Sequence, residues 1–105
     1  MPQFDVYANP NAGSRALMPF VVDVQSDLIS ALPTRLVMPL SRVGSEQARF
    51  PLNLCPPVTL EGEALTLMPH LAAPIDKRLL RHPVQSIRHR AHDISAALDV
   101  VISGV

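Results

Sequence analysis

Apolar and polar residues alternate along several short stretches of the chain, which is the pattern of half-buried β-strands. In the first stretch Phe4 and Val6 share one side, whereas Asp5 and Tyr7 share the other. The turn-forming run from Asn9 to Ser14 comes next and predicts a hairpin. The expected strands are Gln3–Tyr7, Phe20–Gln25, Arg35–Leu40, a stretch that begins at Leu52 and is interrupted by Pro56-Pro57, Val58–Leu60, Ala64–Met68 and a short last strand near Lys77–Leu80.

The C-terminal stretch from Val84 to Val105 has the spacing of an amphipathic helix. It is the only long run without proline in a chain that carries 11 prolines, and a proline inside a helix costs about 3 kcal/mol. Steps of three or four residues place one set of apolar residues on the same side: Ile87, Ala91, Ile94, Leu98, Val101 and Val105. The opposite side carries Arg88, His92, Ser95, Asp99 and Ser103.

Five or so short strands followed by one helix predict an α+β fold that is mainly β. We expect a small antiparallel sheet or a partly open barrel, with the helix covering one face. Pro39 inside the third stretch indicates an edge strand or a bulge, because proline has no backbone N–H to donate. The length of 105 residues, without a repeat or linker, predicts a single domain over residues 1–105.

The composition indicates a folded chain with an aliphatic interior. Hydrophobic residues make up 48% and charged residues 17%, and the formal net charge is zero. Zero net charge argues against a general nucleic-acid binder or a membrane-surface protein. The last third still gathers basic residues, which form either a local binding surface or only a solvated face: Lys77, Arg78, Arg81, Arg88 and Arg90. One cysteine, no signal pattern and no apolar run of membrane length predict a cytoplasmic protein.

No residue pattern indicates catalysis or a cofactor. His89 and His92 could share a metal with His82, but nothing completes the ligand set, so hydrogen-bonded or solvated histidines are the preferred interpretation. Cys55 lies in an apolar strand, where a buried small side chain is favoured over a nucleophile. No residue spacing in the sequence indicates a catalytic acid–base pair. We therefore expect a binding protein with no catalytic residue, metal or cofactor.

The apolar pair Leu28-Ile29 lies in a predicted loop, where large apolar side chains need a reason. One interpretation is that the pair covers the edge of the core. The other is that it forms an exposed contact patch for a partner. The apolar pattern alone leaves both open.

Four stretches resemble the CcdB toxins of type II toxin–antitoxin modules: residues 2–7, 21–29 and 37–40, and the C-terminal helix. The run VDVQSD at residues 22–27 is the most specific. The resemblance implies a homodimer with an SH3-like sheet of five strands and a long C-terminal helix. It also implies a toxin that binds the A subunit of DNA gyrase and traps the cleaved DNA complex, without contacting nucleic acid or a membrane itself. A CcdA-like antitoxin with an acidic, disordered segment would neutralise it.

The resemblance further implies a gyrase-binding surface, made by the apolar pair, the polar helix face and the chain end. The matching positions are Leu28, Ile29, Ala91, His92, Ser95, Ala96, Asp99, Ser103, Gly104 and Val105. The end departs from the family motif Trp-Gly-Ile, because Ser103 stands where the family has Trp. Ile102 likewise replaces an aromatic residue, and Asp99 replaces an asparagine. A tryptophan at a helix tip is the kind of rigid anchor that dominates an interface.

Three functions therefore stay open. The first is a gyrase-binding toxin, weakened by the loss of the terminal Trp. The second is a non-toxic protein with the CcdB fold that keeps antitoxin binding or has another target. The third is a ribonuclease toxin of the related MazF type, which would need an acid–base set and a basic groove.

Overall fold

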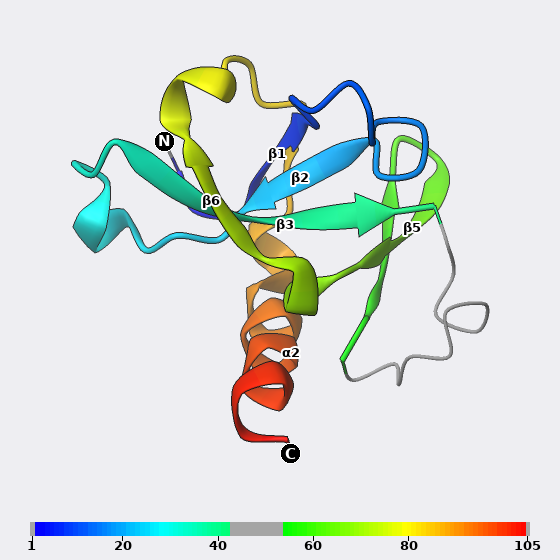
Figure 1. Cartoon of the computed structure of the whole chain (residues 1–105). Helices are drawn as coiled ribbons and strands as arrows, with labels where there is room; N and C mark the ends of the chain where they lie inside the picture. Colours follow the sequence, from blue (N-terminus) through cyan, green and yellow to red (C-terminus); the bar gives the residue numbers. More distant parts are fainter. Residues whose placement is uncertain (1, 43–53, 105) are drawn as a thin grey trace.

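The computed structural model describes residues 2–42 and 54–104 of the chain. Its strands form a half-barrel sheet with one helix at the C-terminal end (Figure 1), which confirms the predicted mainly β, α+β class. The described strands run antiparallel in the order β4-β5-β3-β2-β1-β7, and β6 also pairs with β3. Their bounds are β1 Asp5–Ala8, β2 Phe20–Asp23, β3 Thr34–Ser41, β4 Pro57–Leu60, β5 Glu63–Leu67, β6 Ala73–Asp76 and β7 Gln85–Ser86.

Helical segments connect these strands. In the described part of the chain, four of them are single 3-10 turns: η1 Asp27–Ile29, η2 Pro69–Leu71, η3 Lys77–Leu79 and η4 Arg88–Arg90. The last turn leads directly into the helix α2, Ala91–Ser103. Among the described helices, none has both the length and the apolar character required to span a bilayer.

Strand β3 lies inside the sheet, so the edge position expected from Pro39 is wrong. On one side β3 pairs with β2, and on the other it pairs first with β6 and then with β5. Pro39 sits between these last two partners, where its carbonyl oxygen accepts from the Met68 N–H at 3.0 Å. The N–H and C=O of a strand residue point to the same side of the strand. Pro39 therefore lacks its N–H at the place where β3 stops pairing with β6 and begins to pair with β5.

The alternation predicted for the strands separates two apolar clusters. On the face that meets α2, Val6, Val22 and Met38 are fully buried and form the main core with residues of β4 and β5. On the other face, Tyr7, Val21 and Val37 form a smaller cluster with Leu80. The period-two prediction is therefore confirmed for β1, β2 and β3.

The last predicted strand is wrong, because Lys77–Leu79 form the turn η3 and the strand lies just before it as β6. The Asp76 side chain caps this turn by accepting from the Arg78 N–H at 2.9 Å. A capped turn satisfies backbone donors locally, so the chain leaves the sheet at this point.

The helix begins later than predicted, because Gln85–Ser86 form the strand β7 and Arg88–Arg90 form the turn η4. The Val84 N–H donates to the Val6 carbonyl at 2.7 Å, and the Ile87 N–H donates to the Phe4 carbonyl at 2.9 Å. The segment from Val84 to Ile87 therefore bonds to β1, although helical spacing alone would assign it to α2. The apolar stripe still holds in part, since Ile87, Ile94 and Ala97 are buried.

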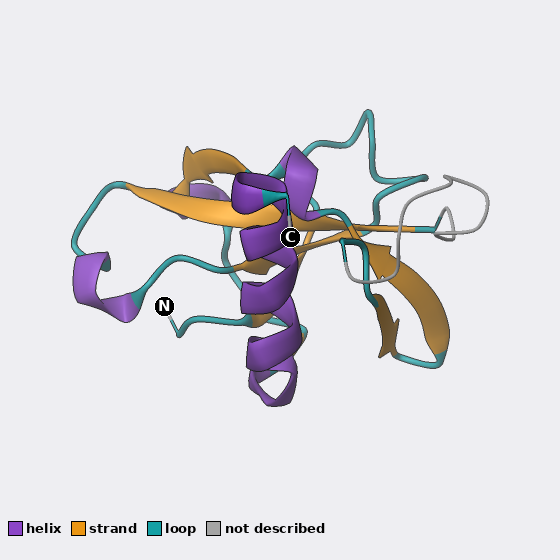
Figure 2. Cartoon of the chain, turned by 90° about the horizontal axis from the view of Figure 1, so that it is seen from below, coloured by secondary structure: helices purple, strands orange, loops and turns teal. Residues whose placement is uncertain are grey.

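The second half of α2 extends away from the sheet. Figure 1 shows its C-terminal end below the strands, and Figure 2, seen from below, shows it in front of them. Val101 is 41% exposed and Ile102 75% exposed, although both are large apolar residues. The first half of the helix therefore anchors it to the core, and the second half offers an apolar surface.

We predict that Ile94→Ala lowers the free energy of unfolding by about 2–4 kcal/mol, because it removes buried carbons and leaves a cavity. The same change at Ile29, which is 48% exposed, should cost less than about 1 kcal/mol. Urea unfolding at one fixed protein concentration measures both values. Equal losses would contradict the assignment of Ile94 to the core.

Candidate functional site

The apolar pair after β2 projects from a tight turn. Leu28 and Ile29 lie on η1, where the Ser26 hydroxyl accepts from the Leu28 N–H at 3.2 Å. The Leu28 side chain is 95% exposed. The first interpretation, in which the pair covers the edge of the core, therefore fails for Leu28, and the pair lies on the surface as an exposed patch.

Gln25 ties this turn to the sheet. Its side-chain Nε2 donates to the Ile29 carbonyl at 3.1 Å, and its Oε1 accepts from the Leu36 N–H at 3.0 Å. Gln25 is itself buried, with 7% of its surface exposed. A short turn whose Leu28 lies almost entirely in solvent is thus held in place by a buried amide.

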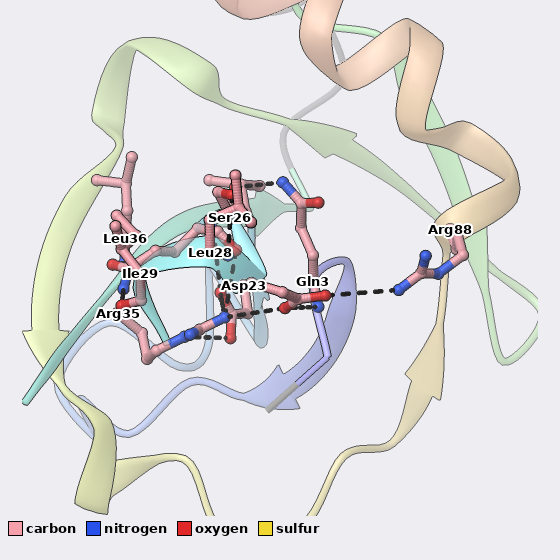
Figure 3. Close-up of polar contacts among 11 residues, drawn as sticks. Gln3, Asp23, Ser26, Leu28, Ile29, Arg35, Leu36 and Arg88 are labelled. Atoms are coloured by element: carbon pink, nitrogen blue, oxygen red, sulfur yellow. Dashed lines mark hydrogen bonds and ion pairs between the residues drawn. The ribbon is translucent and has the colours of Figure 1, made fainter. Parts of the chain in front are cut away.

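Gln25 is held in turn by a buried ion pair between β2 and β3 (Figure 3). Arg35 Nε donates to Asp23 Oδ2 at 2.8 Å, and Arg35 Nη2 donates to Asp23 Oδ1 at 3.0 Å. Both side chains are fully buried. Arg35 Nη2 also donates to the Gln25 carbonyl at 3.2 Å, and the Gln25 N–H donates to Asp23 Oδ1 at 3.1 Å. The two charges therefore satisfy each other and orient the residue that holds η1.

Asp27 extends this network to the chain start and to the helix. Its Oδ1 accepts from the Gln3 N–H at 3.0 Å and lies 3.9 Å from Arg35 Nη2. Its Oδ2 lies 4.0 Å from Arg88 Nη2, at the first residue of η4 (Figure 3). The turn that carries Leu28 is thus linked to three separate parts of the chain. Sequence analysis did not identify the Asp23–Arg35 pair. The only signal was one charged residue in each of the two predicted strands, on the side opposite Val22 and Met38.

Asp5 lies on the same side of the sheet as Asp23. Burial of its carboxyl group, followed by the nearby negative charge of Asp23, raises the pKa of Asp5 above its usual 3.8. Its side chain accepts no hydrogen bond from the described residues that would offset this cost. Asp5 is therefore a buried acid that destabilises the fold when it is ionised.

The helix positions expected to bind a partner lie mostly on the exposed side of α2. His92, Ser95, Ala96 and Asp99 are exposed, and Ala91 is half-buried. The Ser103 hydroxyl donates to the Asp99 carbonyl at 2.7 Å, so it caps its own helix. Gly104 follows with a φ of 76°, a left-handed conformation that ends the helix. Val105 lies outside the described residues.

Within one chain, the pair Leu28-Ile29 on η1 and the exposed residues of α2 make two separate surfaces. Figures 1 and 2 both show η1 apart from the C-terminal half of α2. The two surfaces are connected through the Arg88–Asp27 contact at the start of the helical segment. A single partner that uses both must therefore span the molecule or meet two copies of the chain.

Several basic residues in the last third have acidic neighbours. Arg78 pairs with Asp76 at 2.7 Å, Arg88 with Asp27 at 4.0 Å and Arg90 with Asp93 at 2.8 Å. The extended basic face considered above is therefore largely neutralised. In the described part of the chain, no group of three or more His, Cys, Asp or Glu side chains is placed to hold a metal ion.

Cys55 is fully buried, as its apolar surroundings predicted. The strand expected around it is wrong for Leu54 and Cys55, which lie in a turn and a bend before β4, and residues 52–53 of that stretch lie outside the described residues. Its Sγ lies 3.9 Å from Met68 Sδ and 3.9 Å from His70 Nδ1. Burial raises the pKa of the Cys55 thiol, which keeps the group protonated and unreactive.

A protein-family model matches almost the whole chain. The model described as CcdB protein covers residues 3–104, a range that includes every described strand and α2. The match thus extends over both surfaces and over the buried network between them.

We predict that Asp5→Asn stabilises the protein at pH 7 and that this advantage shrinks as the pH falls toward about 4. The raised pKa means that the folded chain holds the Asp5 proton to higher pH than the unfolded chain does. Stability of the natural chain is therefore lost as pH rises through the folded pKa, whereas the amide of the variant does not titrate. Urea midpoints of both proteins at a series of pH values from acid to neutral measure the difference. A natural chain that is the more stable of the two at neutral pH would refute the interpretation.

Proposed function

The chain belongs to the CcdB family, whose members are toxins of toxin–antitoxin modules, and from this premise we propose that it binds the A subunit of DNA gyrase and traps the cleaved DNA complex. The observation that carries the proposal is the exposed pair on η1. Leu28 is 95% exposed although the buried residues Asp23, Gln25 and Arg35 hold its turn in place. An exposed apolar side chain on a fixed support is a suitable anchor for a protein partner.

The second half of α2 supplies the rest of the proposed surface. His92, Ser95, Ala96 and Asp99 lie on its outer side, and Ser103 and Gly104 end it. Val101 and Ile102 add exposed apolar area beside them. Since η1 and this end of the helix lie apart, binding through both fits a homodimer in which each copy contributes one surface. Leu71, 48% exposed on η2, adds to the apolar area that such a dimer would cover.

The proposal includes a CcdA-like antitoxin and a cytoplasmic location, where gyrase and the antitoxin would be found. Action by stoichiometric binding requires no catalytic residue, and we propose none. Neither a metal nor a cofactor enters the mechanism.

A second candidate is a protein of this family that is not a gyrase poison but keeps antitoxin binding or has another target. The observation that favours it is Ser103, which replaces the family's Trp and directs its hydroxyl back to the Asp99 carbonyl at 2.7 Å. A serine so placed offers a partner little apolar area. Binding measurements on the helix end separate the two candidates.

We predict that Leu28→Ser weakens binding to a gyrase A fragment at least about tenfold, because burying a leucine side chain contributes about 1.5–3 kcal/mol. The matched control is Leu17→Ser in the loop between β1 and β2, since Leu17 is 50% exposed and distant in sequence from η1. Isothermal titration calorimetry measures both variants. Equal weakening by the two substitutions would contradict a specific role for Leu28.

We predict that Ser103→Trp tightens binding to the same fragment by about tenfold or more, since it restores an aromatic anchor at the helix tip. Thr59→Trp, at an exposed position of β4 outside the proposed contacts, controls for the general effect of an added aromatic ring. If the natural chain does not bind and Ser103→Trp does, the second candidate function is the correct one. If neither binds, gyrase is not the target.

A further inference from the structure

A pocket lies beside β1, and none of the proposed gyrase contacts lines it. Its volume is about 240 Å³. Two parts of the chain line it: residues 7–10 with Arg15, around the start of the β1–β2 loop, and Leu79 with Arg81 and His82, at and after the end of η3. The side chains that matter for its chemistry are Tyr7, Asn9, Arg15, Leu79, Arg81 and His82.

The charged lining of this pocket has one sign. Arg15 and Arg81 each bring a guanidinium group, His82 brings an imidazole, and no carboxylate lines the pocket. None of the ion pairs found among the described residues involves Arg15, Arg81 or His82. The pocket therefore keeps two guanidinium charges without an acidic partner in the described part of the chain, whereas Arg78, Arg88 and Arg90 each have one.

Tyr7 adds a hydroxyl donor at the pocket. The residue as a whole is only 4% exposed, so its ring is fixed in the small cluster on this face of the sheet. Burial, followed by the negative charges of Asp5 and Asp23, raises the pKa of Tyr7, so the hydroxyl stays protonated at neutral pH. A largely buried tyrosine normally finds a hydrogen-bond partner for its hydroxyl, and a ligand oxygen in the pocket is a suitable one.

The loop that carries Arg15 is held in shape before any ligand arrives. Asn9 Nδ2 donates to Ser14 Oγ at 2.9 Å and to the Met18 carbonyl at 2.8 Å. The Asn9 carbonyl in turn accepts from Arg15 Nε at 2.9 Å. This bond uses Nε and leaves the two terminal nitrogens of Arg15 for an anion. A preformed pocket loses less entropy on binding than a mobile one.

We propose that this pocket binds the phosphate group of a small organic phosphate, with the organic part against Leu79. Two guanidinium groups, an imidazole N–H and a phenol O–H supply more donors than the two oxygens of one carboxylate can accept. A phosphate monoester has three terminal oxygens and up to two negative charges, which match this set. The inference does not depend on gyrase binding, because none of the proposed gyrase contacts lines the pocket.

The test is a titration of the full chain with phenyl phosphate, followed by amide chemical shifts in nuclear magnetic resonance spectra. We expect saturable shifts confined to residues 7–15 and 79–82. Arg81→Ser should weaken binding by about tenfold or more, because it removes a charged donor. Arg78→Ser is the matched control, since it makes the same change of charge in η3 outside the pocket, and it should change the affinity less than about twofold. Tyr7→Phe, which keeps the ring, should also weaken binding.

Three results would overturn the proposal. One is the absence of saturation by phenyl phosphate at millimolar concentration. Another is equal weakening by Arg78→Ser and Arg81→Ser, which would show only general attraction between charges. The third is binding of a tetraglutamate peptide without binding of phenyl phosphate, which would assign the pocket to an acidic chain. Inorganic phosphate tests the organic part, because it should bind more weakly than phenyl phosphate if Leu79 contributes.

Discussion

The buried pair of Asp23 and Arg35 is the constraint on which the position of η1, and so the proposed gyrase-binding surface, depends. Both side chains are fully buried, and two hydrogen bonds of 2.8 and 3.0 Å connect β2 to β3 between them. Removing one partner of such a pair leaves an uncompensated charge and costs about 3–5 kcal/mol. The pair therefore fixes how β2 leaves the sheet, and with it where the following turn lies. Gln25 connects this pair to η1, because its backbone carbonyl accepts a hydrogen bond from Arg35 and its side chain donates one to the Ile29 carbonyl.

Buried residues support exposed apolar ones in two places. Leu28 can remain exposed without the turn depending on it for stability, because the network beneath holds η1. The helix follows the same principle, since Ile94 and Ala97 anchor its first half and leave Val101 and Ile102 on the surface. This is the arrangement that binding to another protein requires.

Much of the fold could be predicted from local pattern. The alternation of Val6, Val22 and Met38 identified the core side of three strands, since that period is a property of each strand alone. The start of the helix could not be predicted in this way, because residues 84–87 have helical spacing but pair with β1 across the sheet. The residues of the candidate site could be proposed from the sequence, but the buried network that supports them could not. Resemblance to a family located the apolar pair and the polar helix face, whereas only the register of β2 and β3 brings Asp23 and Arg35 together.

The most direct test of this account is the affinity of a Gln25→Met variant for a gyrase A fragment, compared with that of the natural chain. The substitution keeps the size of the side chain but removes its bond to the Ile29 carbonyl and its bond from the Leu36 N–H. If the buried network positions η1 for binding, the variant should still unfold cooperatively and bind about tenfold more weakly. An unchanged affinity, with Leu28 still required for binding, would contradict the claim that the network positions the turn.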